Sequence, residues 1–171
     1  MKDPSRPPMS IREAIRRFRE LHEEFKGGAF KSVEARAFYE TERDEFLRAL
    51  LQGQQLAMRP GQSPRQALRV TATMPLELDI GPRHESTRTL DLASAGFAGL
   101  VAGPLAIRIV CDFALGLAPT PVKGRARVVA NVRDASGAYR TSFAIETMSN
   151  EDRTRLEVAV IDVALDSLPK R

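Results

Sequence analysis

The spacing of the apolar residues changes partway along this chain, and that change limits its fold more than any other feature. Up to about residue 52, apolar side chains recur every three or four positions, as on one face of a helix. From Val70 onward they recur at every second position, as on one face of a strand. The segment 53–64 between the two patterns holds two glycines and two prolines, which is typical of a linker. The sequence therefore predicts a helical part followed by a β-rich part.

Start and stop signals divide the first part into two helices. The first is expected to begin at a capping box formed by Ser10 and Glu13 and to end at Gly27-Gly28. A second helix is expected from Ser32 to about Gln52. The other positions of both helices are densely charged, as expected of faces turned to solvent.

These two helices, joined by a short turn that contains glycine, are predicted to form an antiparallel hairpin over residues 10–52. A helix pair of this size buries little apolar surface alone, so its apolar stripes are expected to pack on the rest of the chain or on a second copy in a homodimer. The sequence leaves both arrangements open. Residues 1–9 are rich in proline, and we expect them to be a disordered tail.

The β-rich part consists of short apolar–polar alternations separated by turn residues. Pro75 lies within the longest alternation and predicts an edge strand or a bulge there, because proline donates no backbone hydrogen bond. A final helix is expected, capped by Ser149 or Asn150. About six strands with no helix between them indicate an antiparallel barrel or sandwich. The expected strands lie near residues 70–80, 86–92, 96–101, 105–113, 122–132 and 139–145.

Composition excludes several classes of protein. No run of about 18 apolar residues could span a membrane, and the N-terminus lacks the apolar core of a signal peptide, so a cytoplasmic protein is expected. A single cysteine, Cys111, and two distant histidines, His22 and His84, argue against a disulfide, a metal site and a nucleophile–base pair. A formal charge of +4, no tryptophan and 6% aromatic residues make nucleic-acid binding an unfavoured interpretation. We therefore expect neither an enzyme nor a bound cofactor.

Some single residues carry expectations of their own. Cys111 falls in the inward phase of its predicted strand and is expected to be an inert core thiol. His22 is expected at the boundary of the apolar face of its helix. Four basic residues share the outward face of one predicted strand and are interpreted as solvated exterior, with a docking patch for an acidic partner or ligand as the alternative: Lys123, Arg125, Arg127 and Arg133.

Two short motifs stand beside the first strands of the β-rich part. Arg65-Gln-Ala-Leu-Arg69 directly precedes the alternation that begins at Val70, and Asp91-Leu-Ala-Ser-Ala-Gly96 follows later. An arginine fork can donate two hydrogen bonds to a phosphate or to guanine O6 and N7, and it can stack on a base. Two arginines four residues apart in a loop can therefore reach around a compact anionic ligand from different sides.

The pair of motifs resembles the ligand signature of PilZ domains, which is RxxxR followed by [D/N]xSxxG. That family binds the bacterial second messenger cyclic di-GMP, and its fold is a six-stranded antiparallel barrel. The resemblance implies a mainly β protein with helices: a PilZ-like barrel over residues 65–168, with a C-terminal helix, preceded by the N-terminal helical hairpin. One position departs from the signature, because Ala93 occupies the serine position and Ser94 follows it.

The resemblance also implies roles for single residues. Arg65 and Arg69 would clamp the guanines and phosphates, and Asp91 would accept hydrogen bonds from the N1–H and N2 amino group of a guanine. Gly96 would supply a turn and let the backbone approach the ligand. Ala93 cannot contribute the hydroxyl of the signature, and Ser94 could replace it only if the two lie in the turn and not in the ladder.

Two functions follow from the resemblance. In the first, the protein is a cyclic di-GMP receptor, and the ligand orders residues 53–69 and so resets a surface that binds a protein partner. In the second, it is an adapter with a degenerate site that binds protein partners of the motility or pilus machinery without nucleotide. Retention of Arg65, Arg69 and Asp91 favours the first function, whereas Ala93 favours the second.

Overall fold

The computed structural model describes residues 10–62 and 65–169, so the expected disordered tail and Pro64 lie outside the described residues. The described chain divides into two units. Residues 10–62 and 165–169 form one unit, and residues 65–164 form the other. Neither unit contains a described helix that is both long and apolar enough to cross a lipid bilayer.

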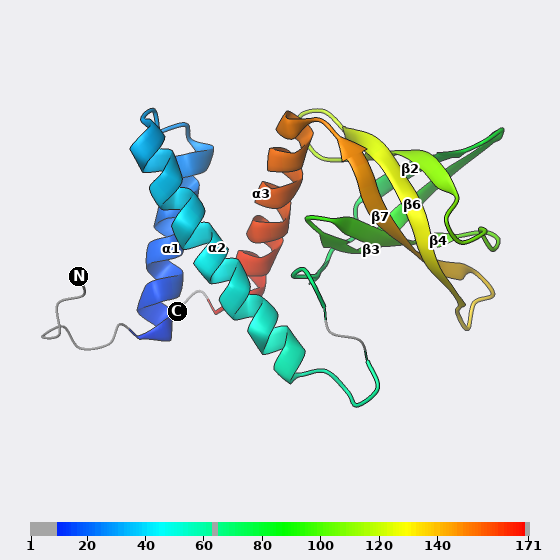
Figure 1. Cartoon of the computed structure of the whole chain (residues 1–171), viewed down its shortest axis with the longest axis horizontal. Helices are drawn as coiled ribbons and strands as arrows, with labels where there is room; N and C mark the ends of the chain where they lie inside the picture. The colour runs from blue at the N-terminus through cyan, green and yellow to red at the C-terminus, as the bar shows by residue number, and fades with distance from the viewer. Residues whose placement is uncertain (1–9, 63–64, 170–171) are drawn as a thin grey trace, which may run out of the picture. The chain divides into compact units, whose positions relative to one another are not determined.

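The helical unit contains α1 (Ile11–Lys26) and α2 (Val33–Leu56), which lie side by side as a hairpin (Figure 1). The predicted cap at Ser10 is confirmed, because its side chain accepts a hydrogen bond from the Glu13 N–H. Ser32, the expected start of the second helix, caps α2 by accepting a hydrogen bond from the Ala35 N–H. α2 extends one turn beyond its expected end. A single glycine costs a helix only about 1 kcal/mol, so Gly53 does not stop it.

Aromatic side chains fill the interface between α1 and α2. Phe18 stacks on Phe46 with ring centroids 4.3 Å apart, and Phe25 stacks on Tyr39 at 4.0 Å. His22 is fully buried among them, and its Nδ1 lies 2.8 Å from the Tyr39 hydroxyl. The expected boundary position of His22 is therefore wrong. The hydroxyl provides the hydrogen bond without which a buried imidazole would be costly.

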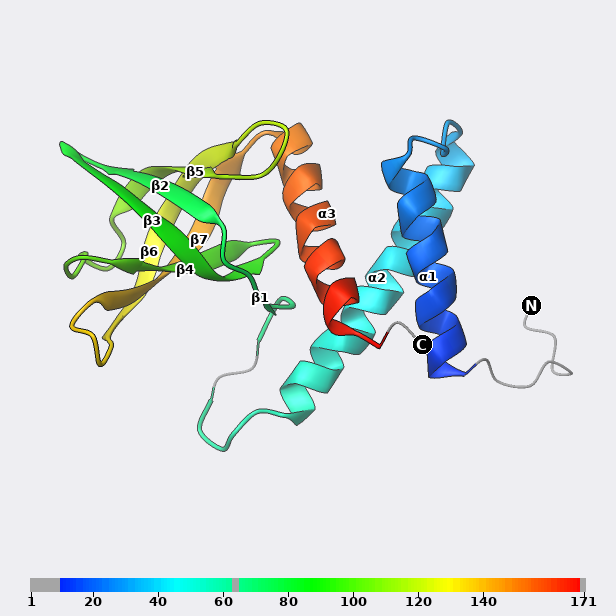
Figure 2. The same ribbon diagram turned by 180° about the vertical axis from the view of Figure 1, so that it is seen from behind.

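The second unit is a closed six-stranded antiparallel barrel, as predicted (Figures 1 and 2). The strands follow one another around the barrel in the order β3-β2-β5-β6-β7-β4, and pairing of β4 with β3 closes it. Phe97 stands between Phe113 and Phe143 in the core, with ring centroids 5.0 Å from each. The strands are β2 (Pro75–Ile80), β3 (Arg83–Ala93), β4 (Gly96–Val101), β5 (Val110–Leu115), β6 (Val122–Arg133) and β7 (Tyr139–Met148).

The long strand expected from residue 70 is interrupted. A short strand, β1 (Val70–Thr71), pairs with the end of β3, and β2 begins only at Pro75. The buried Thr89 hydroxyl spans the interruption, because it accepts a hydrogen bond from the Met74 N–H and donates one to the Ala72 carbonyl. The break that Pro75 predicted is therefore stabilised by a side chain from the neighbouring strand.

The expected strand over 105–113 is shorter than predicted, because β5 begins at Val110. Just before it, Arg108 has a left-handed backbone conformation with φ of 74°, which ends the extended pattern. The Arg108 N–H still donates to the Val128 carbonyl at 2.8 Å, so this loop remains attached to β6.

The C-terminal helix, α3 (Asn150–Ser167), is confirmed, and Ser149 caps it by accepting a hydrogen bond from the Asp152 N–H. Its first turns are attached to the barrel by polar contacts. Asp152 accepts a hydrogen bond from the Lys123 N–H, and Arg155 donates to the Leu117 carbonyl.

Candidate functional site

The short pairing of β1 with β3 brings the two sequence motifs together. Val70 pairs with Leu92, and Thr71 pairs with Asp91. Arg69 is the residue directly before β1, so this register places the end of the first motif beside the start of the second. Figure 2 shows β1 alongside the barrel strands. The buried Leu68 and Val70 anchor this end of the loop, whereas Arg65 at its start is exposed.

The Asp91 carboxylate lies between two arginines. The Arg69 Nη1 is 4.0 Å from Oδ1 of Asp91, and the Arg140 Nη2 donates a hydrogen bond to Oδ2. The Asp91 side chain is only 13% exposed, whereas both arginines remain near half exposed. A carboxylate this sheltered from water is stabilised by cationic partners. Two arginines around one carboxylate leave the site with excess positive charge, which suits an anionic ligand.

Arg140 belongs to this cluster, although the sequence motifs do not contain it. Asp91 pairs with Ala98 on β4, and Ala98 pairs with Ser142 on β7, so the three residues form a row on one face of the sheet. Arg140 lies two residues before Ser142 and points to the same face. The adjacent Leu92 is fully buried in the barrel, so this face is the outer one. Only the closure of the barrel brings Arg140 near Asp91.

Ala93, in the serine position, lies on the same face as Asp91. It is the last residue of β3, two residues after Asp91, and it pairs with Gly96 in a regular ladder. A serine hydroxyl at this position would therefore stand beside the Asp91 carboxylate. Ser94 lies in the two-residue turn between β3 and β4, outside the ladder. Strand alternation therefore does not fix the direction of the Ser94 side chain. This meets the condition under which Ser94 could replace the missing hydroxyl.

Gly96 is required by the barrel itself. A Cβ at this position would lie 2.3 Å from the Phe143 carbonyl oxygen, so only glycine lets β4 approach β7 this closely. The Ile145 N–H also donates to the Ala95 carbonyl at 2.9 Å, which attaches the turn to β7. Barrel closure therefore explains the glycine of the motif, and its contact with a ligand stays a prediction.

The other sequence candidates lie away from this cluster. On β6, the Nε of Arg125 lies 3.5 Å from Asp112 and the Nε of Arg127 lies 2.8 Å from Glu146, as expected of a solvated barrel exterior with mixed charge. Cys111 is buried, and burial, with the nearby Asp112 and Asp79 charges, raises its pKa to about 11. Within residues 10–62 and 65–169, no group of acids, histidines and the cysteine could hold a metal ion.

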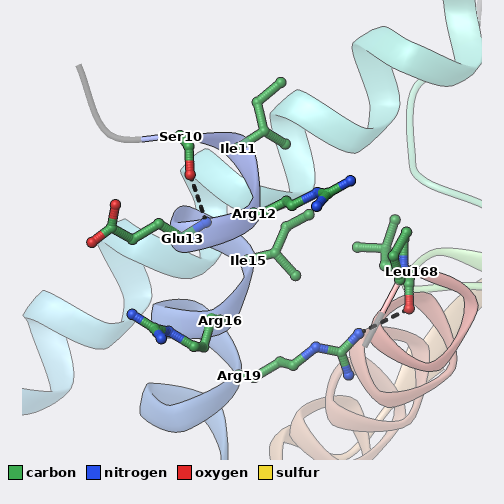
Figure 3. A pocket seen from close by; sticks show the side chains of 9 residues that line it. Ser10, Ile11, Arg12, Glu13, Ile15, Arg16, Arg19 and Leu168 are labelled. Carbon is green, nitrogen blue, oxygen red and sulfur yellow. Dashed lines mark hydrogen bonds between the residues drawn. The ribbon is translucent and has the colours of Figure 1, made fainter. Parts of the chain in front are cut away.

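A groove of about 910 Å³ runs along the first turns of α1, beside the residues that follow α3 (Figure 3). Arg12, Arg16 and Arg19 line it together with apolar side chains that include Ile15 and Leu168. Arg19 donates to the Leu168 carbonyl at 3.2 Å, whereas Arg12 and Arg16 make no ion pair in the part of the chain that the structure describes. The groove therefore combines an apolar floor with two available cations.

No family model and no curated protein matches this chain. Solved structures do match it. MotI/DgrA, an inhibitor of motility from Bacillus subtilis, has a TM-score of 0.56 at 17% identity over 63% of this chain and 54% of its own. The PilZ domain of Escherichia coli YcgR with cyclic di-GMP scores 0.51 at 15% identity over 61% and 95%. The complex of K. pneumonia MrkH with cyclic di-GMP scores 0.56 at 15% identity over 62% and 55%.

These matches cover nearly all of the isolated YcgR domain but only about half of the MotI and MrkH chains. Identities this low establish a shared fold and no finer property. The barrel of this chain therefore has the fold of those domains, and the N-terminal helices extend it.

Proposed function

We propose that this chain, whose barrel has the PilZ fold, is a non-enzymatic receptor for cyclic di-GMP. The observation that carries the proposal is the register of β1 against β3, which places Arg69 4.0 Å from Asp91. This pairing brings two motifs that are separate in sequence to one place on the barrel, as a shared ligand site requires. With this ligand, the proposal also implies a protein of the bacterial cytoplasm.

The proposed binding mode follows from the chemistry of the ligand. Cyclic di-GMP presents two phosphates and two guanines, and the forks of Arg65 and Arg69 suit both groups. The Asp91 carboxylate, an acceptor only, suits the N1–H and amino group of a guanine. Ala93 removes one hydroxyl from this set. Losing one hydrogen bond to a charged ligand costs on the order of 1.5–3 kcal/mol, so binding would be weaker by about ten- to a hundredfold but not abolished.

Isothermal titration of the full chain with cyclic di-GMP, with GMP as a control, tests the proposal. We expect saturable binding that disappears when Arg65 and Arg69 are both changed to alanine. Arg153→Ala is the matched control, because Arg153 is an exposed arginine on α3 outside the motifs. No heat with the wild type at high micromolar nucleotide would end the proposal. Ala93→Ser is expected to tighten binding by about ten- to a hundredfold.

The second candidate function is an adapter that binds protein partners without nucleotide. The groove along α1 favours it, because Arg12 and Arg16 beside Ile15 suit an acidic segment that also carries apolar residues (Figure 3). Such a partner could belong to the motility or pilus machinery, and MotI is itself described as an inhibitor of motility.

Cell motility separates the two functions. A receptor should lose its effect on motility when Arg65 and Arg69 become alanine. An adapter should keep that effect and lose it instead when Arg12 and Arg16 become glutamate. If neither pair of substitutions changes motility while the protein remains folded, both functions are wrong for that process.

A further inference from the structure

Arg140 of β7 is the only partner shown to hydrogen-bond the Asp91 carboxylate within the described residues. The Arg69 Nη1 lies 4.0 Å from Oδ1, which is too long for a hydrogen bond. The Arg69–Asp91 contact is therefore a longer ion pair, whereas the Arg140–Asp91 contact includes a hydrogen bond. Of the two arginines, Arg140 is therefore the one whose hydrogen bond can orient the Asp91 carboxylate.

We propose that Arg140 is a positioning residue of the nucleotide site, holding the Asp91 carboxylate in the orientation that receives a guanine. This inference rests on the proposed function. An ionised carboxylate has about four acceptor positions, so one hydrogen bond from Arg140 leaves acceptor capacity on both oxygens for the N1–H and amino group. The guanidinium also adds a third arginine, with Arg65 and Arg69, beside an anionic ligand.

The barrel makes this contact possible through one small residue. The contact runs diagonally across β4. Asp91 on β3 pairs with Ala98, whereas Arg140 on β7 pairs with Leu100, so Ala98 is the small residue beside Asp91. Neighbouring strands are about 4.8 Å apart, so the two side chains must reach across two such spacings. Aspartate and arginine together can do so over a methyl group. A large side chain at position 98 would stand between them.

The test is titration of the full chain with cyclic di-GMP. Arg140→Gln is expected to weaken binding by about tenfold or more, and Arg140→Lys, which keeps a cation that can reach Oδ2, should recover part of that loss. Arg153→Gln is the control, because it removes the same charge from an exposed position on α3 that makes no side-chain ion pair among the described residues. It should change affinity by less than twofold.

A double-substitution cycle separates positioning from direct binding. If Arg140 acts through Asp91, the variant with both Asp91→Asn and Arg140→Gln should bind no more weakly than Asp91→Asn alone. Losses that simply add would overturn the positioning role and indicate that Arg140 contacts the ligand independently. Circular dichroism and urea unfolding of each variant show whether the fold is intact.

Other outcomes are equally clear. If Arg140→Gln binds cyclic di-GMP as tightly as the wild type or more tightly, the inference is wrong, whereas the proposed receptor function is unaffected. The same holds if Arg140→Lys binds as weakly as Arg140→Gln, since the retained cation would then contribute nothing. Absence of binding by the wild type would overturn the proposed function and this inference together.

Discussion

At the scale of the residue, partners and burial decide what each ionisable group can do. Asp91 is sheltered and has two arginine neighbours, whereas Asp79 and Glu77 on β2 are more exposed and both approach His84. The first arrangement concentrates positive charge around one carboxylate, and the second concentrates negative charge around one imidazole. We therefore expect the surroundings of Asp91 to favour anions and the surroundings of His84 to favour a protonated imidazole.

His84 is expected to keep its proton above its ordinary pKa of 6.5. The hydrogen bond to Asp79, 2.6 Å from Nδ1, is the main cause of the raised pKa, and Glu77 adds to it at 2.9 Å from Nε2. Because the pKa is raised in the folded state, the stabilisation is complete below about pH 6.5 and is lost as the pH rises through the folded pKa. NMR titration of the imidazole checks this.

The matched variants for His84 are Asp79→Asn, which should lower its pKa, and Asp44→Asn on α2, which should leave it unchanged. A titration midpoint at or below 6.5 in the wild type would contradict the ion-pair explanation.

Cys111 is expected to be unreactive in the native protein. Burial, then the charges of Asp112 and Asp79, raise its pKa to about 11, so only about 0.1% of the thiol would be ionised at pH 8. A disulfide reagent such as Ellman's reagent should react at once in urea and only as fast as the protein unfolds without it. Complete labelling of the native protein within minutes would show that the thiol is accessible.

At the scale of the element, the single strand that the sequence predicts over residues 70–80 is divided into β1 and β2. Thr89 on β3 is fully buried, and its hydroxyl satisfies the backbone where β1 and β2 separate. Because β1 carries Arg69 to Asp91, this interruption also sets the register of the candidate site. The Thr89 hydroxyl therefore helps to fix the backbone beside the point where Arg69 meets Asp91.

Thr89→Val is expected to destabilise the protein by about 1–3 kcal/mol, because it leaves the Met74 N–H and the Ala72 carbonyl without a partner at nearly constant volume. Urea unfolding measures the difference. Thr73→Val is the control, since Thr73 is exposed in the same interruption, and it should change stability by less than about 0.5 kcal/mol. Equal effects of both variants would show that the Thr89 hydroxyl has no special role.

At the scale of the whole molecule, two units share one chain. Residues 57–69 connect α2 to β1, and they end in the motif that begins at Arg65. A ligand bound by Arg65 and Arg69 would restrict this connection, so binding in the barrel unit can change the freedom of the helical unit without any new contact between them.

Hydrogen exchange tests that coupling. We expect α1 and α2 to exchange more slowly on addition of cyclic di-GMP, and the Arg65→Ala, Arg69→Ala variant to show no such change. Protection confined to the barrel in a wild type that binds the nucleotide would mean that the connection transmits nothing, although the receptor itself would stand.

The amino-acid sequence by itself determined the features that depend on neighbours a few residues apart. The caps at Ser10 and Ser32, the change of hydrophobic period and the turn glycines are local signals, and they predicted the hairpin, the barrel and the final helix. Two expectations failed, one because of a residue distant in the sequence and one because of adjacent residues. Tyr39 allowed His22 to be buried, and the helix continued through Gly53 because its neighbours favour helix.

Only the tertiary structure decided how the candidate site is assembled. The sequence contains both motifs, but the register of β1 on β3 determines that Arg69 meets Asp91. Arg140 and the demand for glycine at position 96 were invisible because both depend on β4 lying against β7. Sheet closure joins residues that are distant along the chain, and no periodicity or spacing encodes which of them will meet.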